Sequence, residues 1–410
     1  MTLSVGFVLA ALCVAGFVGP LVAEIVNVPS AVVELIMGFG LSFLVPASAL
    51  AKNGPIANLG GLGFFVLMFL VGTEFNPREI WNGSRSALVM GVVLFLTSVS
   101  ISFLLLGHRS GTSSIWVLAG SAASVGVAAP VLYAHGWSGT RFARDVLVIG
   151  SVAEILYLVV LTALGVSTRH DSREAAILLG ARATLMVAFI ATLVYAIRKI
   201  RTRVPRHFHR WFRRDDPIEV GLRGTFALLF VVVAFSSVVQ IPNVLGSLFA
   251  GVVFRSVIGN AKAILERLTS VANSFFIPIF FLDIGLHTDL RVGIAHLLPT
   301  IGLVLAALCV SRLVLVPFMI KRGDSLRQAL AGSFLLMAPL TLLIATAEIG
   351  AAGGFLGPVN VSAMIVTATI SAVIFPALSK RLLGDKGGTE PGTSVATSNV
   401  SSPAEVGASN

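Results

Sequence analysis

Charged residues are scarce in this chain: they make up 12% of its 410 positions, while hydrophobic residues make up 56%. A water-soluble domain cannot hide that much apolar surface, so the composition excludes a soluble globular protein and indicates a polytopic membrane protein. Cysteine is almost absent. Cys13 and Cys309 both lie inside apolar runs, which argues against a disulfide framework and against a catalytic thiol.

Histidine is present, but its pattern does not suggest a site. The seven histidines, among them His135 and His296, lack the spacing of a metal-ligand set, so we expect neither a metal centre nor a cofactor. Acidic residues are outnumbered by basic ones, 19 against 29, which gives a net charge of +10. That balance alone would fit a nucleic-acid partner, and the placement of the charges argues against one.

Apolar runs bounded by glycine, proline or charged residues predict an all-α polytopic membrane protein with thirteen spans. The shortest are the second and the ninth. The membrane domain then covers residues 1–383, and the small, polar segment 384–410 is expected to be a disordered cytoplasmic tail. The predicted spans are 3–23, 30–46, 58–76, 86–107, 113–134, 145–167, 174–197, 222–240, 243–258, 268–286, 293–320, 327–350 and 357–379.

The basic residues predict the orientation. The linker RKIRTRVPRHFHRWFRRDDP, which follows the seventh span, is strongly basic and should lie in the cytoplasm. In the plasma membrane this places the N-terminus outside and the C-terminus inside. Most other lysines and arginines then fall on the cytoplasmic side, and we expect the aromatic and basic linker to contact anionic lipid headgroups. The basic charge is thereby explained without nucleic acid.

Two ten-residue stretches that lie seven spans apart resemble each other. Phe64–Thr73 reads FFVLMFLVGT, and Phe275–Ile284 reads FFIPIFFLDI. An odd offset makes the two copies cross the membrane in opposite directions. Inverted repeats of this kind are typical of secondary transporters, which bind their substrate near the midplane at the repeat interface.

Prolines interrupt two spans at the same repeat offset. Pro130 follows Ser121 and Ser124 in the fifth span. Pro339 precedes Thr341 in the twelfth. A proline inside a helix removes a backbone donor and clashes with the preceding turn, so the helix can break and free carbonyl oxygens for a cation. The alternative for each span is an ordinary proline kink with small residues for close packing.

Glu154 lies near the middle of the sixth span, in RDVLVIGSVAEILYLVVLTAL. A carboxylate at that depth costs at least about 2.5 kcal/mol on insertion scales, so such a residue usually lines a protein interior or a wet cavity. We interpret Glu154 as a transport site. The alternative is a protonated glutamate that is hydrogen-bonded to a neighbouring helix.

Other charges fall at different depths. Arg312, in the eleventh span, needs a carboxylate or carbonyl oxygens as partners. It either ties two helices together and holds a nearby glutamate ionised, or takes part in transport. Asp283 lies about one turn from the outer end of the tenth span, as a vestibule ligand or an interfacial residue. Glu34 and Glu348 lie near helix ends, where we expect solvent to reach them.

Several stretches, in this order, resemble one known family. They are LMFLVGTEFNPREIW, SAASVGVAAPVL, the helix that holds Glu154, LGSLFAGVVF, FFIPIFFLDIGL, and SRLVLVPF followed by LRQALAGSFLLMAP. Over about residues 5–380 the chain resembles the monovalent cation:proton antiporters of the sodium/proton exchanger superfamily, most closely the bacterial cation:proton antiporter-2 branch. The resemblance implies a homodimer of thirteen-helix subunits. Each has a core and a dimerisation domain, with two broken helices crossing at the ion site.

The resemblance also assigns residues by position. Glu154 stands where the family has its ion- and proton-binding Asp, and Arg312 stands where it has a Lys or Arg. The chain departs from the family at Ala153, where many members have Asp or Asn, and at Leu340–Leu342, where many read Arg-Gly-Glu. The residues expected to bind the ion or proton are Glu154, Ser124, Asp283 and Thr341, with Arg312 as the structural charge partner and breaks at Pro130 and Pro339.

The activity implied by the resemblance is exchange of a monovalent cation, Na⁺ or K⁺, for H⁺ by alternating access, and not enzymatic catalysis. One titrating carboxylate predicts electroneutral, one-for-one exchange. Two other classes remain open: a proton-coupled exporter of an organic solute on the same fold, and a non-transporting membrane sensor or assembly subunit. Flux of a cation against a pH gradient distinguishes the first class from the other two.

Overall fold

The computed structural model describes residues 5–26, 28–43, 54–74, 85–107, 113–126, 128, 131–132, 136–137, 140–167, 172–203, 219–258, 262–288 and 294–383. All regular structure in these segments is helical. Ten of the described helices are long and apolar enough to cross a membrane, and two shorter apolar helices accompany them, Ser30–Ser42 and Asn243–Val257. With α6 (Ser113–Ser121) they occupy the thirteen predicted spans, so the fold class is confirmed. The predicted tail, 384–410, lies outside the described residues.

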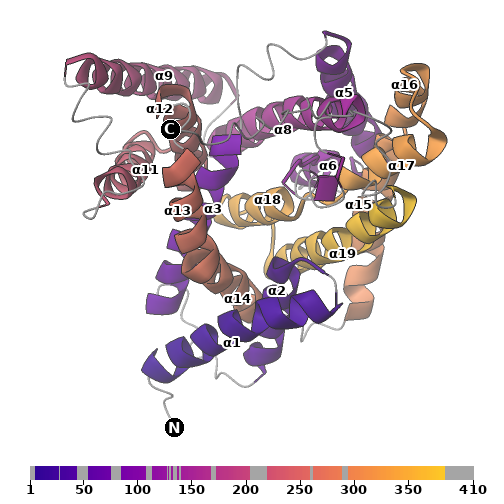
Figure 1. Cartoon of the computed structure of the whole chain (residues 1–410), viewed down its shortest axis with the longest axis horizontal. Helices are drawn as coiled ribbons and strands as arrows, with labels where there is room; N and C mark the ends of the chain where they lie inside the picture. Colours follow the sequence, from indigo (N-terminus) through magenta and orange to yellow (C-terminus); the bar gives the residue numbers. More distant parts are fainter. Residues whose placement is uncertain are drawn as a thin grey trace, which may run out of the picture.

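One half of the molecule is a group of helices that we call the panel, at the left and bottom of Figure 1. Except for the amphipathic segment Lys262–Val271, the helices of the panel are apolar around most of their circumference, as expected of segments that face lipid on one side and protein on the other. Its helices are α1 (Val5–Val26), α2 (Ser30–Ser42), α3 (Pro55–Glu74), α11 (Val220–Val238), α12 (Asn243–Ile258), α13 (Lys262–Val271) and α14 (Ile277–His287), the last two joined by one π-helical turn, Ala272–Phe276.

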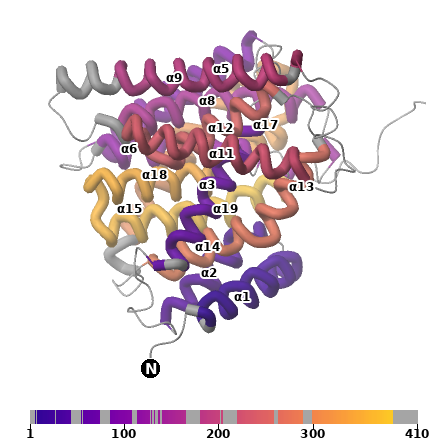
Figure 2. The backbone as a smooth tube through the Cα atoms, turned by 90° about the vertical axis from the view of Figure 1, so that its left-hand side faces the viewer, coloured from indigo at the N-terminus to yellow at the C-terminus, as the bar shows by residue number. Residues whose placement is uncertain are grey.

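The other half, which we call the bundle, surrounds α6. Figure 1 shows α6 end-on, with α8, α15 and α18 around it. Between the two halves runs α9 (Ser172–Arg203), which contacts α8 on one side and α12 on the other and forms the upper edge of Figure 2. The bundle helices besides α6 are α5 (Arg85–Leu106), α8 (Arg141–Ser167), α15 (Ile294–Arg312), α16 (Leu315–Lys321), α17 (Leu326–Leu335), α18 (Leu340–Ala352) and α19 (Pro358–Leu383).

Two glycine pairs bring panel helices into backbone contact. A methyl group added at Gly38 of α2 would collide with the backbone of α14 at Leu282 and Gly285. One added at Gly72 of α3 would collide in the same way with α12, beside Gly251. Only glycine permits so close an approach, and small residues at helix interfaces are the usual means of tight packing in membranes.

These glycine pairs also show the inverted repeat. Gly251 follows Gly38 by 213 residues, and Gly285 follows Gly72 by the same 213. The pair α3–α12 is therefore the counterpart of α2–α14. The repeat predicted from the sequence is present, but its register was wrong: pairing Phe64 with Phe275 implies 211 residues and is two positions out.

Two helix interruptions meet against α8. The first begins where α6 ends at Ser121, and the chain has no helical structure over residues 122–126. The second separates α17 from α18, which begins directly after Pro339. A methyl group at Gly150 of α8 would lie 2.5 Å from Cγ1 of Val125 and 2.6 Å from Cδ2 of Leu336, so both interruptions touch this glycine. Pro130 lies outside the described residues, and its part in the first break stays a prediction.

Glu34 is not where we expected it. The residue is only 2% exposed, so the expectation that solvent reaches it was wrong. It lies in the second turn of α2, where its Cγ would be 2.9 Å from a methyl group added at Gly19 of α1. Its Oε2 atom has no hydrogen-bond partner among the described residues. The absence of a side chain at Gly19 is what lets α1 cover the carboxyl group.

Ion pairs fasten the start of α8 to the turn between α16 and α17. Nε of Arg322 lies 2.8 Å from Oδ2 of Asp145, and Nη2 of Arg141 lies 3.7 Å from Oδ1 of Asp324. Arg322 also donates a hydrogen bond to Ser86 of α5. Burial raises the pKa of Asp324 above its ordinary value, although Arg141 opposes the rise.

Candidate ion-binding site

The carboxyl group of Glu154 lies at the crossing of the two interruptions. Glu154 is 1% exposed, and both of its oxygens accept hydrogen bonds from the segment that follows α6. Oγ of Ser124 donates to Oε1 at 3.2 Å, and the backbone N–H of Val125 donates to Oε2 at 3.0 Å. The structure thus brings together Glu154 and Ser124, two of the residues selected from the sequence.

The hydroxyl of Ser124 has a second contact that shapes this segment. Its Oγ accepts a hydrogen bond from the backbone N–H of Gly126 at 3.2 Å. The side chain therefore satisfies a backbone donor that α6 would have paired had the helix continued, as serine does in short turns. The same oxygen holds the turn together and contacts the carboxyl group, so the broken segment is folded around Glu154.

The sequence did not single out Tyr157 and Gly150, which line the same face of α8. Residues 150, 154 and 157 are spaced by four and three positions and so lie above one another on a helix. The Tyr157 hydroxyl forms a hydrogen bond with Oγ1 of Thr346 in α18. Because Thr346 donates its proton to the Leu342 carbonyl at 2.7 Å, Tyr157 is the donor to Thr346. Their helical spacing from Glu154 was the sequence feature that could have identified Gly150 and Tyr157 as neighbours of the carboxyl group.

Arg312 of α15 is fully buried and binds the open end of α6. Its Nη1 donates to the Gly120 carbonyl at 3.2 Å and its Nη2 to the Ser121 carbonyl at 3.0 Å; Nη2 also donates to the Ala122 carbonyl. A cation is favoured at a helix C-terminus, where carbonyl groups lack partners and the helix dipole is negative. Arg312 therefore takes three carbonyls at the break, and the Glu154 carboxyl and the Ser124 hydroxyl supply oxygen atoms beside them.

Thr341 and Asp283, the two other predicted ion ligands, have no contact with Glu154 that the structure establishes. Thr341 is half-buried in the first turn of α18, directly after the second interruption, and its role as an ion ligand stays a prediction. Asp283 lies in a separate cavity of about 390 Å³ between α3, α14, α18 and α19, whose described lining does not include Glu154. A second cavity, of about 550 Å³, adjoins the first at Gly61, Phe64 and Glu348.

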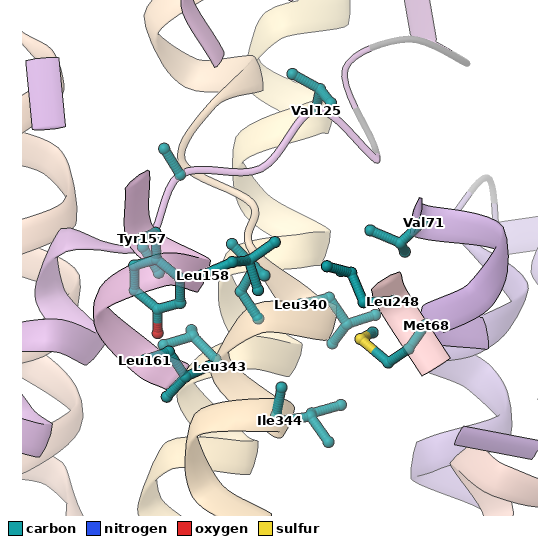
Figure 3. Close-up of a cluster of buried hydrophobic side chains, with 14 of the residues drawn as sticks. Met68, Val71, Val125, Tyr157, Leu158, Leu161, Leu248, Leu340, Leu343 and Ile344 are labelled. Atoms are coloured by element: carbon teal, nitrogen blue, oxygen red, sulfur yellow. The ribbon is translucent and has the colours of Figure 1, made fainter. Parts of the chain in front are cut away.

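The bundle faces the panel across apolar side chains at the level of the crossing. Figure 3 shows Met68 and Val71 of α3 and Leu248 of α12 on the panel side. Among the labelled side chains opposite them, Leu340, Leu343 and Ile344 come from α18, and Tyr157, Leu158 and Leu161 come from α8. At these positions the bundle and the panel share one apolar cluster, whose contacts carry no directional bonds.

A polytopic helical fold with two interrupted helices around a buried carboxyl group matches a known family. The family described as "Sodium/hydrogen exchanger, transmembrane" matches residues 9–383. The chain belongs to this family. Among curated relatives, the exchanger-family chain is 29% identical over 384 residues to the putative Na⁺/H⁺ antiporter YjbQ of Bacillus subtilis, covering 87% of this chain and 59% of YjbQ. It therefore spans well under two thirds of that relative's length.

Other comparisons agree with the family. The chain is 25% identical over 369 residues to the high-affinity Na⁺/H⁺ antiporter NhaS3 of Synechocystis, covering 85% of this chain and 76% of NhaS3. Among solved structures, the sodium proton antiporter MjNhaP1 from Methanocaldococcus jannaschii has a TM-score of 0.64 at 15% identity, covering 93% of this chain and 99% of that one. At this identity the likeness shows the exchanger fold.

Among the described residues, Glu154 is the one buried carboxyl group at the crossing of the two interruptions. Ala153, next to Glu154, is 1% exposed and carries no titrating group. Leu342 is fully buried beside the second interruption. Within the described residues, no group of three or more His, Cys, Asp and Glu side chains is placed to hold a metal ion.

Proposed function

We propose that this protein is a secondary antiporter that exchanges a monovalent cation, Na⁺ or K⁺, for H⁺ by alternating access. The observation that carries the proposal is the Glu154 carboxyl, buried at the crossing of two interrupted helices in a member of the sodium/hydrogen exchanger family. Intramembrane carboxyls are costly to bury and mark ion pathways. The relatives named as Na⁺/H⁺ and K⁺/H⁺ antiporters support the substrate class.

The chemistry follows from what Glu154 can bind. A carboxylate in this position accepts either a proton or a monovalent cation, and the two exclude each other because both neutralise the same charge. Ser124 supplies a hydroxyl oxygen next to the carboxyl, and we propose that Thr341, in the first turn of α18, supplies a second one. Oxygen ligands of this kind suit alkali cations. Arg312 holds the broken end of α6 through its hydrogen bonds to the Gly120 and Ser121 carbonyls.

We further propose that the exchange is electroneutral. Ala153 stands where a second carboxylate would be needed for a two-proton cycle, and it is buried beside Glu154. Each turnover then moves one proton against one cation. For the assembly, we propose a homodimer in the plasma membrane, with the N-terminus outside and the C-terminus in the cytoplasm, because the basic linker after the seventh span should face the cytoplasm.

The test is transport by purified protein in proteoliposomes, followed as dequenching of a pH-sensitive dye when sodium, potassium or lithium is added. We expect Glu154→Gln to abolish cation-driven proton movement. The matched control is Glu34→Gln, which changes another buried glutamate of a membrane helix in the same way but lies in the panel, away from the crossing. Exchange by Glu154→Gln at a rate near that of the unmodified protein would overturn the proposal.

A second candidate function is proton-coupled export of an organic solute. The two adjoining cavities, of about 390 and 550 Å³, favour it because they are larger than an alkali cation requires. In that case a solute, and not sodium or potassium, should protect the purified protein against thermal unfolding. The dye assay should then respond to that solute and not to the cations.

A further inference from the structure

The cavity around Asp283 contains an acid–base pair that the exchange at Glu154 does not use. Asp283 lies on α14 and is 8% exposed, and it lines the cavity of about 390 Å³ together with His287, one helical turn further along. Gly60 of α3 is what gives the carboxyl group its room, since a methyl group there would collide with Oδ2 of Asp283. Both residues lie at the end of α14, which the predicted topology places on the membrane face opposite the start of α8.

The hydrogen bonds of this pair leave the carboxylate incompletely compensated. Nδ1 of His287 lies 3.0 Å from the backbone carbonyl oxygen of Asp283 and 3.1 Å from its Oδ1. A ring nitrogen has one proton to donate. Oδ1 of Asp283 makes no hydrogen bond with any described residue, so its contact with the ring is electrostatic and has full strength only when the imidazole is charged. A buried carboxylate without a positive partner is costly.

When His287 is neutral, the Asp283 carboxylate needs another positive charge beside it, and a cation can reach the carboxylate through the cavity. Besides Asp283, the described lining residues whose side chains carry an oxygen atom are Thr288, Glu348 and Ser362. Glu348, from α18, is the remaining titratable residue among the described lining of this cavity; the described lining residues from α3 and α19 are not titratable. A negative carboxylate with further oxygens around a cavity suits a partly hydrated monovalent cation.

We propose that this cavity is a second monovalent-cation site, in which Asp283 binds either a cation from the cavity or the protonated imidazole of His287. The site deepens the proposed antiport function, on which its choice of ligand rests, by adding a position where cation and proton compete before either reaches Glu154. Under the predicted orientation the cavity faces the outside, so it concentrates the external cation at high pH and releases it at low pH.

The experiment measures cation binding without transport, in the Glu154→Gln background. Thermal unfolding of the purified full-length protein is followed in detergent with NaCl or KCl, against choline chloride, at about pH 8.5 and about pH 5.5. We expect both salts to raise the unfolding temperature at the higher pH. Since histidine titrates near pH 6.5, competition should weaken the apparent cation affinity about tenfold at the lower pH.

Two further variants in that background identify the residues. Asp283→Asn should remove the rise in unfolding temperature. His287→Gln should preserve it and abolish the loss of affinity at about pH 5.5, because the competing imidazolium is gone; a purely structural histidine would not have this effect. If Asp283→Asn fails to fold, the pH dependence of the His287→Gln variant still decides.

The outcomes separate this inference from the antiport proposal. A Glu154→Gln protein that no alkali cation stabilises overturns the second site and leaves the antiport proposal intact. A cation effect that survives Asp283→Asn, or a pH dependence unchanged by His287→Gln, also overturns it. Continued exchange by Glu154→Gln in liposomes would instead overturn the role of Glu154 and leave the cation site in place.

Discussion

Removing the guanidinium of Arg312 should destabilise the bundle. Arg312→Met keeps much of the apolar length of the side chain but leaves the carbonyls of Gly120, Ser121 and Ala122 without their donors. A buried acceptor that loses its hydrogen-bond donor costs about 1–3 kcal/mol. Because the three carbonyls are consecutive, one local shift of the backbone can relieve all of them in part, so their costs do not add in full. We therefore expect a total loss of about 3–5 kcal/mol, less than three times the cost of one lost acceptor bond.

The assay is thermal unfolding of the purified protein in detergent, compared with two other variants. Arg312→Lys should recover part of the loss, since an ammonium group can reach some of the same carbonyls but lacks the planar fork. Arg182→Met is the matched control: it removes an exposed guanidinium, which donates to Gln240, and should change stability by less than about 1 kcal/mol. An Arg312→Met protein as stable as the unmodified one, yet unable to exchange ions, would refute the structural role and place Arg312 in the transport step.

Four further predictions concern other parts of the fold. Gly150→Ala should cost about 1–3 kcal/mol by overpacking and slow exchange in the dye assay, whereas Gly180→Ala, with nothing within 4 Å of the added methyl group, should do neither. Glu34→Leu should raise the free energy of unfolding by about 1–3 kcal/mol, because an oxygen without a partner is removed from an apolar place; a fall in the unfolding temperature would contradict this. The pKa of Asp324 is raised in the folded protein, so the native state binds the extra proton and stability falls as the pH rises between the unfolded and folded pKa values. Asp324→Asn should therefore be more stable than the unmodified protein at neutral pH. The difference in stability should shrink as the pH approaches about 3.9. A potassium–valinomycin potential, in liposomes assayed with sodium, should leave the exchange rate unchanged, and Ala153→Asp is the substitution expected to create a potential dependence, at about 2.3 kcal/mol per moved charge per 100 mV.

The positions of the helices and of Glu154 could be predicted from sequence for a common reason. In a membrane each span must satisfy its own backbone hydrogen bonds, so apolar run length alone finds the helices, and a carboxyl in such a run stands out by its cost. The two short helices, α2 and α12, were found in this way as well.

The contacts between helices could not be predicted in the same way. Apolar stretches resemble one another, so the repeat was aligned at 211 residues where the glycine pairs require 213. The burial of Glu34 depends on the missing side chain of Gly19, and the partners of Arg312 depend on where α6 stops. Each of these features is decided by how closely two distant segments approach, which hydropathy does not encode.

The glycine pairs of the panel also limit where the molecule can move. Backbone presses on backbone at Gly38–Gly285 and at Gly72–Gly251, so α2 and α14, or α3 and α12, cannot slide past each other without a collision. The boundary shown in Figure 3 is different, because Met68 and the leucines that meet across it can change rotamer and repack at little cost. In the proposed transport cycle we therefore expect displacement at that boundary, with the panel fixed and the bundle moving Glu154 past it.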